Sequence, residues 1–233
     1  MIKIVCLKWG EKYGSEYVNR LYNGIKRNCS LPFELYCFTN DKVGIVSDVI
    51  VHDLPYSHNI VSWWNKIWLF SDEVPFNKGE RLFYLDLDTL ITGNIDYLLM
   101  DNTEGLVMLQ DFYWGIARTA TQSASGVMAW NAGNFSHLWN SFIQNPEQAI
   151  ESVKPHGDQV FIGNTLKHNV KYWQDLYPDQ IVSFKVHCNN GLPAQAKIVC
   201  FHGEPSIPDA ATKSWKSWKF QADPQEWIMD YWK

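Results

Sequence analysis

Two aspartates, Asp86 and Asp88, interrupt an otherwise apolar stretch, RLFYLDLDTLI, at residues 81–91. We expect one strand over 81–91, and alternate residues of a strand project to the same side, so the two carboxylates would lie roughly 7 Å apart. Like charges at the edge of a core repel each other and lose hydration. A divalent cation relieves both effects because hard cations bind carboxylate oxygens. The spacing therefore predicts a metal site; the alternative is a strand that ends in two solvated acids.

Three further positions carry groups that could do chemistry. Lys66 stands in the apolar stretch VSWWNKIWLF, where its ammonium group either reaches the surface or meets an anion. His202 follows an apolar run at 197–201 and precedes Gly203. Asp158 opens an apolar stretch at 159–166, where its side chain is either an N-cap or a functional carboxylate. None of these residues is diagnostic by itself.

The elements that would position these residues follow an α/β pattern. Apolar runs at 2–7, 33–38 and 45–51 predict strands, and apolar residues at helical spacing predict a helix over 15–28. A strand–helix–strand start predicts a mostly parallel, Rossmann-like sheet flanked by helices. No GxGxxG motif follows the first strand, which argues against a dinucleotide cofactor.

The rest of the chain continues this alternation without an internal repeat or a linker, which predicts a single domain. Further helices are expected at 61–70, at 135–144 with Asn134 as its cap, at 159–166, and after an apparent capping box at 223–226. Further strands are expected at 105–109, 125–131, 181–186 and 197–201. Loops are expected at 52–59 and 117–124.

Composition excludes several classes of protein. The net charge is −5 and no basic run alternates with aromatic residues, so nucleic acid is not an expected partner. The five cysteines are odd in number and form no CxxC pair, which fits a reducing compartment and no zinc site. The apolar run at 2–7 is too short for a signal sequence, and no apolar stretch reaches the length of a membrane span. We therefore expect a soluble, cytoplasmic protein.

The 12 Trp, 11 Tyr and 12 Phe residues suit either an aromatic core or a carbohydrate-binding surface, because the C–H faces of sugars stack on aromatic rings. A carbohydrate-binding module without catalysis is thus one alternative function. This alternative does not explain why two acidic residues, Asp86 and Asp88, interrupt an apolar stretch. A second alternative is a phosphatase of the haloacid dehalogenase type, which DLDTL at 86–90 resembles. That fold needs a later strand with a second pair of acids, and GDQVFI at 157–162 lacks both.

The sequence LFYLDLDTLITGNID at 82–96 resembles the DXD segment of glycogenin-like, family 8 glycosyltransferases of the GT-A fold. The order of other motifs agrees with this resemblance over residues 2–206. A basic residue precedes the motif at Lys66, ASGVM at 124–128 resembles an Asn-Ser-Gly-Val-Met strand, Asp158-Gln159 resembles an Asp-Gln helix start, and His202-Gly203 resembles a late metal-binding histidine.

The resemblance implies transfer of a sugar from a nucleoside diphosphate sugar, with UDP as the expected nucleotide, to a hydroxyl of a glycan or other acceptor, with retention. It implies Mn²⁺, or Mg²⁺, bound by Asp86, Asp88 and His202, with Asp86 also at the donor ribose. The residues implied in donor binding are Leu7, Trp9, Tyr13, Thr39, Asp41, Lys66 and Gly203. Asp158 and Gln159 would face the transferred sugar. Residues 1–100 would form the nucleotide-binding half, 101–206 the sugar and acceptor half, and 207–233 a Trp-rich C-terminal segment.

The sequence departs from the family at one place. The family has a His-x-x-Gly-x-x-Lys-Pro-Trp tail whose Lys binds the diphosphate, whereas this chain reads HGEPSIP from His202 and has no such Lys. Lys213 and Lys216 lie further downstream and could take that role. The departure suggests kinship with microbial or phage-type transferases that share the same core.

Overall fold

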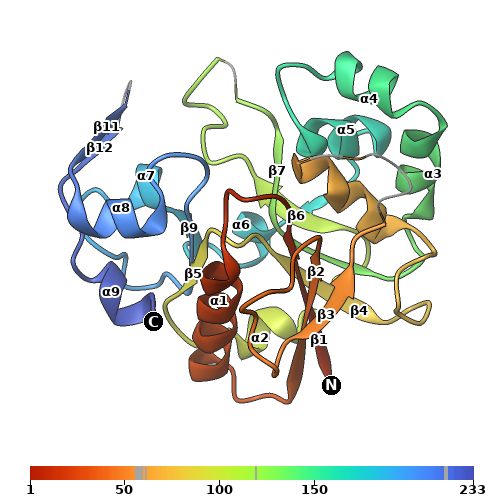
Figure 1. Ribbon diagram of the computed structural model, residues 1–233. Helices are drawn as coiled ribbons and strands as arrows, with labels where there is room; N and C mark the ends of the chain where they lie inside the picture. The colour runs from red at the N-terminus through yellow and green to blue at the C-terminus, as the bar shows by residue number, and fades with distance from the viewer. Residues whose placement is uncertain (56–59, 61, 119, 218–219) are drawn as a thin grey trace.

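The structure, a computed structural model, describes residues 1–55, 60, 62–118, 120–217 and 220–233. Within these residues, a seven-stranded sheet forms the centre of the molecule (Figure 1). Its strands, in spatial order, are β3 (Ile50–Asp53), β2 (Phe33–Thr39), β1 (Ile2–Lys8), β4 (Arg81–Leu85), β7 (Ser123–Asn131), β6 (Val107–Gln110) and β8 (Lys171–Tyr172). Strand β7 runs antiparallel to β4 and β6, and the other neighbours are parallel. The expected mostly parallel sheet is confirmed.

The first strand–helix–strand unit is as predicted. Helix α1 (Ser15–Asn28) joins β1 to β2, which pair in parallel from Ile2 opposite Phe33. Strand β3 begins later than the expected run at 45–51. The chain first makes turns in which the amides of Ile45 and Val49 donate to carbonyls three residues earlier, and Gly44 has φ +80°. Pairing with β2 starts only at Ile50.

The stretch at 81–91 is not one strand, and that prediction is wrong. Strand β4 ends at Leu85, and β5 (Thr89–Ile91) belongs to a second sheet of order β5-β10-β9. Asp86 and Asp88 lie in the turn between them, which is closed by a 3.2 Å bond from the Thr89 amide to the Asp86 carbonyl. The chain leaves the first sheet here because β4 pairs with β1 and β7, whereas β5 pairs with β10 (Ile198–Cys200).

Alternation along β4 separates two hydrophobic cores on the two faces of the sheet. Phe83 and Leu85 pack on the face covered by α1, by α2 (Asp96–Leu99) and by the second sheet. Leu82 and Tyr84 pack on the opposite face, against the 3₁₀ helix η2 (Ser62–Phe70). Asp86 directly continues the Leu82–Tyr84 series, so its side chain emerges on the η2 side.

The helices on the η2 face largely follow the sequence expectations. They are η2, α3 (Ser136–Gln144), α4 (Pro146–Ser152) and α5 (Asp158–Thr165), which gather on one side in Figure 1. The expected apolar helix at 61–70 is confirmed for 62–70, and residue 61 lies outside the described residues. Two expected end signals are wrong: Phe135 rather than Asn134 precedes α3, and Gly157 rather than Asp158 precedes α5. Helix α3 ends at Gln144, and Pro146 begins α4 with Asn145 as its cap.

The last third of the chain covers the other side of the sheet (Figure 1). Its elements are α6 (Trp173–Leu176), β9 (Ile181–Ser183), α7 (Phe184–His187), β10, α8 (Ile207–Thr212), β11 (Trp215–Ser217), β12 (Phe220–Ala222) and α9 (Ile228–Tyr231). The expected strand at 181–186 stops at Ser183, whose hydroxyl accepts the Val186 amide and begins α7 instead. The expected capping box at 223–226 does not form, because Trp227 precedes α9.

Two smaller predictions can also be compared with the structure. The expected loop at 117–124 gives way to β7 from Ser123, and of the expected loop at 52–59 residues 52–53 belong to β3, with 56–59 outside the described residues. All five cysteines are free thiols. Within the described residues, none of the helices combines the length and apolar character needed to cross a bilayer.

Candidate functional site

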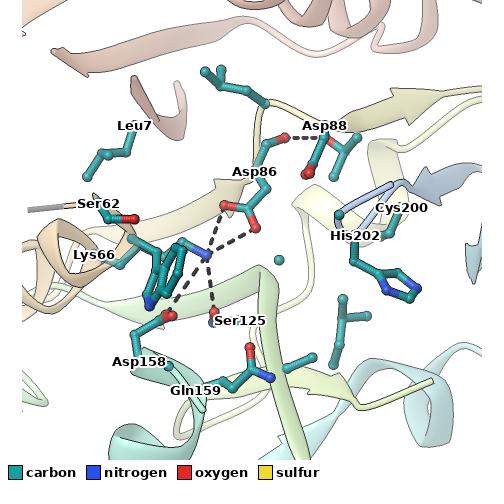
Figure 2. A pocket seen from close by; sticks show the side chains of 18 of the residues that line it. Leu7, Ser62, Lys66, Asp86, Asp88, Ser125, Asp158, Gln159, Cys200 and His202 are labelled. Atoms are coloured by element: carbon teal, nitrogen blue, oxygen red, sulfur yellow. Dashed lines mark hydrogen bonds and ion pairs between the residues drawn. The ribbon is translucent and has the colours of Figure 1, made fainter. Parts of the chain in front are cut away.

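A cavity of about 620 Å³ opens where β1 and β4 end, at the carboxyl edge of the parallel strands. This edge is where ligands bind in open α/β sheets. The cavity brings together ten of the predicted site residues from five separate parts of the chain. They are Leu7, Trp9, Tyr13, Lys66, Asp86, Asp88, Asp158, Gln159, His202 and Gly203. Figure 2 shows the polar centre of this cavity.

Asp86 is held rigidly in the wall of the cavity. The Tyr84 hydroxyl donates a 2.6 Å hydrogen bond to Oδ1, and Lys66 Nζ lies 2.9 Å and 3.0 Å from the two carboxylate oxygens. A Cβ on Gly126 would stand 3.4 Å from Asp86 Oδ2, so the backbone of β7 passes close to this carboxylate. Each carboxylate oxygen therefore already has a donor, and the orientation of the side chain is fixed.

Lys66 is the centre of a buried polar cluster (Figure 2). Besides Asp86, its ammonium group contacts Ser125 Oγ at 3.1 Å and lies 3.9 Å from Asp158 Oδ2. Burial alone lowers the pKa of Lys66, but the charges of Asp158 and Asp86 outweigh it and the pKa is raised. Lys66 is thus a permanent cation. The sequence left open whether its ammonium group reaches the surface or meets an anion, and the structure shows that it meets an anion.

Asp158 faces this cation with an incompletely satisfied carboxylate. Its side chain is buried, and Oδ2 makes no hydrogen bond with the described residues. Burial raises the pKa of Asp158, and the charge of Lys66 opposes that shift. Asp158 is the first residue of α5 rather than the residue that precedes it, so it is not the N-cap. Its side chain lines the cavity instead. Its neighbour Gln159 donates to Thr121 Oγ1 at 3.3 Å.

Asp88 lies on the other side of the turn, where the Tyr13 hydroxyl donates to Oδ2 at 2.8 Å. Burial and the charge of Asp86 raise the pKa of Asp88 to about 7. Desolvation and like-charge repulsion therefore act on this pair, as inferred from the sequence. The strand argument for their proximity was wrong, but the turn still presents both carboxylates to one cavity.

His202 lines the same cavity but its ring is engaged elsewhere. Nε2 forms a 2.7 Å hydrogen bond with Ser183 Oγ, and the ring stacks on Phe112 and meets Tyr113 edge-on. Figure 2 shows the ring pointing away from Asp86 and Asp88. Burial and the charge of Lys185 lower the pKa of His202 to about 3, so the imidazole is neutral, as a metal ligand must be.

The residues present fit a divalent cation in part. Two carboxylates that face one cavity are the donor set a hard cation prefers. However, no three His, Cys, Asp or Glu side chains come together as a ready ion site in the described part of the chain. The ligand role of Asp86, Asp88 and His202 stays a prediction.

Two predicted donor-binding residues lie outside the cavity lining. Thr39 is buried at the end of β2, and its hydroxyl donates to the Asp41 carbonyl at 2.9 Å. The Asp41 carboxylate lies 3.4 Å from Lys8 Nζ. Lys8 is buried, and its ammonium group also donates to the Asp41 carbonyl. The contacts among Thr39, Asp41 and Lys8 therefore hold the loop beside the cavity in place.

The sequence reasoning missed several residues that line or support the site. Tyr84 bonds Asp86 and Ser125 bonds Lys66, so both residues hold the Asp86–Lys66 pair. Alternation along 81–86 could have indicated Tyr84, and the motif at 124–128 could have indicated Ser125. Trp63, half exposed at the cavity rim, follows no pattern that separates it from core tryptophans. Asp111 and Phe112 lie in a segment without a motif.

No protein-family model and no curated protein sequence matches this chain. Solved structures do. The galactosyltransferase LgtC, in a complex with donor and acceptor sugar analogs, matches 88% of this chain and 89% of its own with a TM-score of 0.63 and 13% identity. An active-site mutant of LgtC matches 97% of this chain and 99% of its own, with a TM-score of 0.63 and 12% identity.

The glycosyltransferase GlyE of Streptococcus pneumoniae TIGR4 matches the whole chain with a TM-score of 0.69 and 14% identity. The chain spans 61% of the GlyE chain. At these identities the likeness concerns the arrangement of the backbone rather than particular residues. The chain therefore has the α/β fold of GT-A-type glycosyltransferases, as its motifs predicted.

Proposed function

We propose that this protein is a metal-dependent glycosyltransferase that transfers a sugar from a nucleoside diphosphate sugar, UDP-linked in the first instance, to a hydroxyl of a glycan or another acceptor. The observation that carries the proposal is the cavity in which Asp86, Asp88 and the buried cation Lys66 meet at the carboxyl edge of a glycosyltransferase fold. The match to a galactosyltransferase seen with donor and acceptor sugar analogs supports the substrate class.

The charges of the site suit a departing diphosphate. Breaking the bond between sugar and diphosphate leaves negative charge on the leaving group, and fixed positive charge lowers the barrier to that step. A divalent cation held by Asp86 and Asp88, Mn²⁺ or Mg²⁺, would supply such charge. Lys66 holds Asp86 in place and keeps its own proton, and Tyr13 orients Asp88.

The side of the cavity at α5 suits the transferred sugar. Asp158 and Gln159 offer carboxylate and amide groups, which are the partners that sugar hydroxyls need. Trp9 and Trp63 line the same cavity and provide flat aromatic faces for a sugar ring or a base. Retention at the anomeric carbon is carried over from the resemblance, and proton NMR of the product would distinguish retention from inversion.

Thermal unfolding with nucleotide sugars tests the proposal directly. UDP-, GDP- and dTDP-sugars, each with and without Mn²⁺, are added to the wild-type chain. We expect at least one donor to raise the unfolding temperature in a Mn²⁺-dependent manner, because a ligand that binds only the folded state stabilises it. Asp86→Asn/Asp88→Asn should lose this shift and the Mn²⁺-dependent hydrolysis of the donor.

The matched control is Asp72→Asn/Asp175→Asn, which changes two exposed acids outside the cavity lining and should keep both effects. Stabilisation by no nucleotide at all would overturn the proposal. Phosphate release from an aryl phosphate with Mg²⁺ would favour the phosphatase alternative instead. Sugar affinity that survives in Asp86→Asn/Asp88→Asn, without any nucleotide effect, would favour a carbohydrate-binding module.

A further inference from the structure

Lys185 is a further buried cation, and among the described residues none forms an ion pair with it. It lies in α7 with 9% of its surface exposed. Its ammonium group makes no hydrogen bond or ion pair with another described residue, and its recorded neighbour is the Trp215 ring, whose centroid is 5.7 Å from Nζ. Burying an unpaired ammonium group is costly, so proteins retain one where it has something to bind.

The position of Lys185 connects it to the cavity described above. A Cβ built on Gly203 would stand 3.8 Å from Lys185 Nζ, and Gly203 lines the cavity. Gly203 has φ +78°, a conformation that favours glycine, so no side chain stands between the ammonium group and this part of the wall. Lys185 is therefore placed to reach an anion that enters the cavity beside Gly203.

The electrostatics agree with that position. Burial lowers the pKa of Lys185, and the nearby charges of Asp88 and Glu204 offset part of the shift. The charge of Lys185 in turn contributes to the lowered pKa of His202. The ammonium group thus lies within electrostatic range of Asp88 and His202.

The lysines downstream of Gly203 are less suited to bind an anion in the cavity. Lys213 is exposed and forms a 2.6 Å ion pair with Asp209 one turn earlier in the chain. Lys216 is exposed on β11. None of the three lysines is part of the cavity lining, but Lys185 Nζ lies next to Gly203, which is part of it.

We infer that Lys185 binds the diphosphate of the nucleotide donor and supplies the positive charge that the segment after Gly203 lacks. The inference rests on the proposed function, because it takes the ligand to be a nucleoside diphosphate. It assigns the role to a residue of α7, a separate element from the chain that follows His202. The charge of Lys185 would then add to that of Lys66 at the phosphates, each as a point charge.

Nucleotide binding by Lys185→Met separates this role from a structural one. Removing an unpaired buried ammonium group should leave the unfolding temperature without ligand unchanged or higher, because the desolvation cost disappears. The affinity for UDP with Mn²⁺, measured by titration calorimetry, should fall about ten- to a hundredfold, the usual range for a hydrogen bond to a charged group. The affinity for uridine, which has no phosphate, should not change.

Lys213→Met is the matched control and should bind UDP as the wild type does, and Lys185→Arg should recover part of the affinity because it keeps the charge. If the wild type binds UDP and Lys185→Met binds it equally well, the inference is wrong while the proposed function stands. If the wild type binds no nucleoside diphosphate, the proposed function itself fails. A Lys185→Met variant that unfolds at a lower temperature and binds UDP normally would show a structural role only.

Discussion

At the scale of single residues, the site depends on how one buried ammonium group is shared. Lys66 contacts both oxygens of Asp86 and faces Asp158, so one cation compensates two carboxylates that are otherwise taken out of water. Asp158 depends on it most, because its Oδ2 has no hydrogen bond within the described residues. Breaking a buried pair by removing one partner leaves an uncompensated charge, which costs more than the pair itself contributes.

Lys66→Met should therefore destabilise the fold strongly. We expect the free energy of unfolding to fall by about 3–5 kcal/mol, measured by urea denaturation at pH 7. Adding Asp158→Asn to that variant should recover part of the loss, because it removes one of the stranded charges. A Lys66→Met variant with the wild-type urea midpoint would contradict the ion-pair account.

At the scale of elements, the motif that resembles a glycosyltransferase signature also has a mechanical role. The Asn-Ile-Asp turn places Asp96 at the start of α2, where its carboxylate accepts from the Ser30 amide at 2.9 Å, from the Ser30 hydroxyl and from the Asn94 amide at 3.0 Å. These bonds tie the turn after β5 to the loop between α1 and β2. The segment that follows the acidic turn at 86–88 and strand β5 is thus fixed to a neighbouring loop by contacts outside the cavity.

This anchoring predicts a pH dependence of stability. The side-chain bonds from Asn94 and Ser30 lower the pKa of Asp96 from its ordinary value of 3.8 to about 2. A carboxyl whose pKa is lowered by folding stabilises the fold above its ordinary pKa and loses that contribution as the pH falls through its folded pKa. The contribution of Asp96 should therefore be complete at pH 6 and decline between about pH 4 and pH 2.

Asp96→Asn should unfold at lower urea than the wild type at pH 6, and the difference should shrink as the pH approaches 2. Urea denaturation at a series of pH values measures this difference. Asp72→Asn, an exposed acid without a recorded partner in the described residues, is the control and should show no such trend. A difference that is constant across the pH range would contradict the assignment.

At the scale of the whole molecule, the C-terminal segment at 207–233 belongs to the main core. Trp232 is 2% exposed and its ring meets Tyr17 of α1 edge-on at 4.9 Å between centroids, while Arg20 lies over the same ring. Arg27 of α1 donates to the carbonyls of Tyr231 and Lys233. Segments some two hundred residues apart in sequence therefore share one hydrophobic core.

Trp232→Ala should destabilise the entire protein rather than release the C-terminal segment alone. Truncating a buried aromatic residue costs about 3–5 kcal/mol. We expect the urea transition to move to lower concentration and to remain a single step when followed by circular dichroism and by tryptophan fluorescence. Met229→Ala, which changes a half-exposed side chain in α9, the helix that Trp232 follows, should have little effect. Two separate transitions would indicate an independent C-terminal unit.

The local elements were predictable where sequence periodicity determines them. Helix α1 and strands β1 and β2 match their predicted spans closely, because burial of one helix face and of whole strands leaves a repeating apolar pattern. The order of motifs likewise predicted the fold, and ten of the predicted site residues line one cavity.

The ends of elements and the partners of polar groups were decided only by the tertiary structure. The apolar pattern continues through 81–91, yet the chain changes sheets at Asp86, because backbone pairing with β7 on one side and β10 on the other is a long-range choice that local pattern does not encode. Lys185 illustrates the same limit. Nothing near it in sequence indicates chemistry, and it acquires its position only because α7 packs behind Gly203.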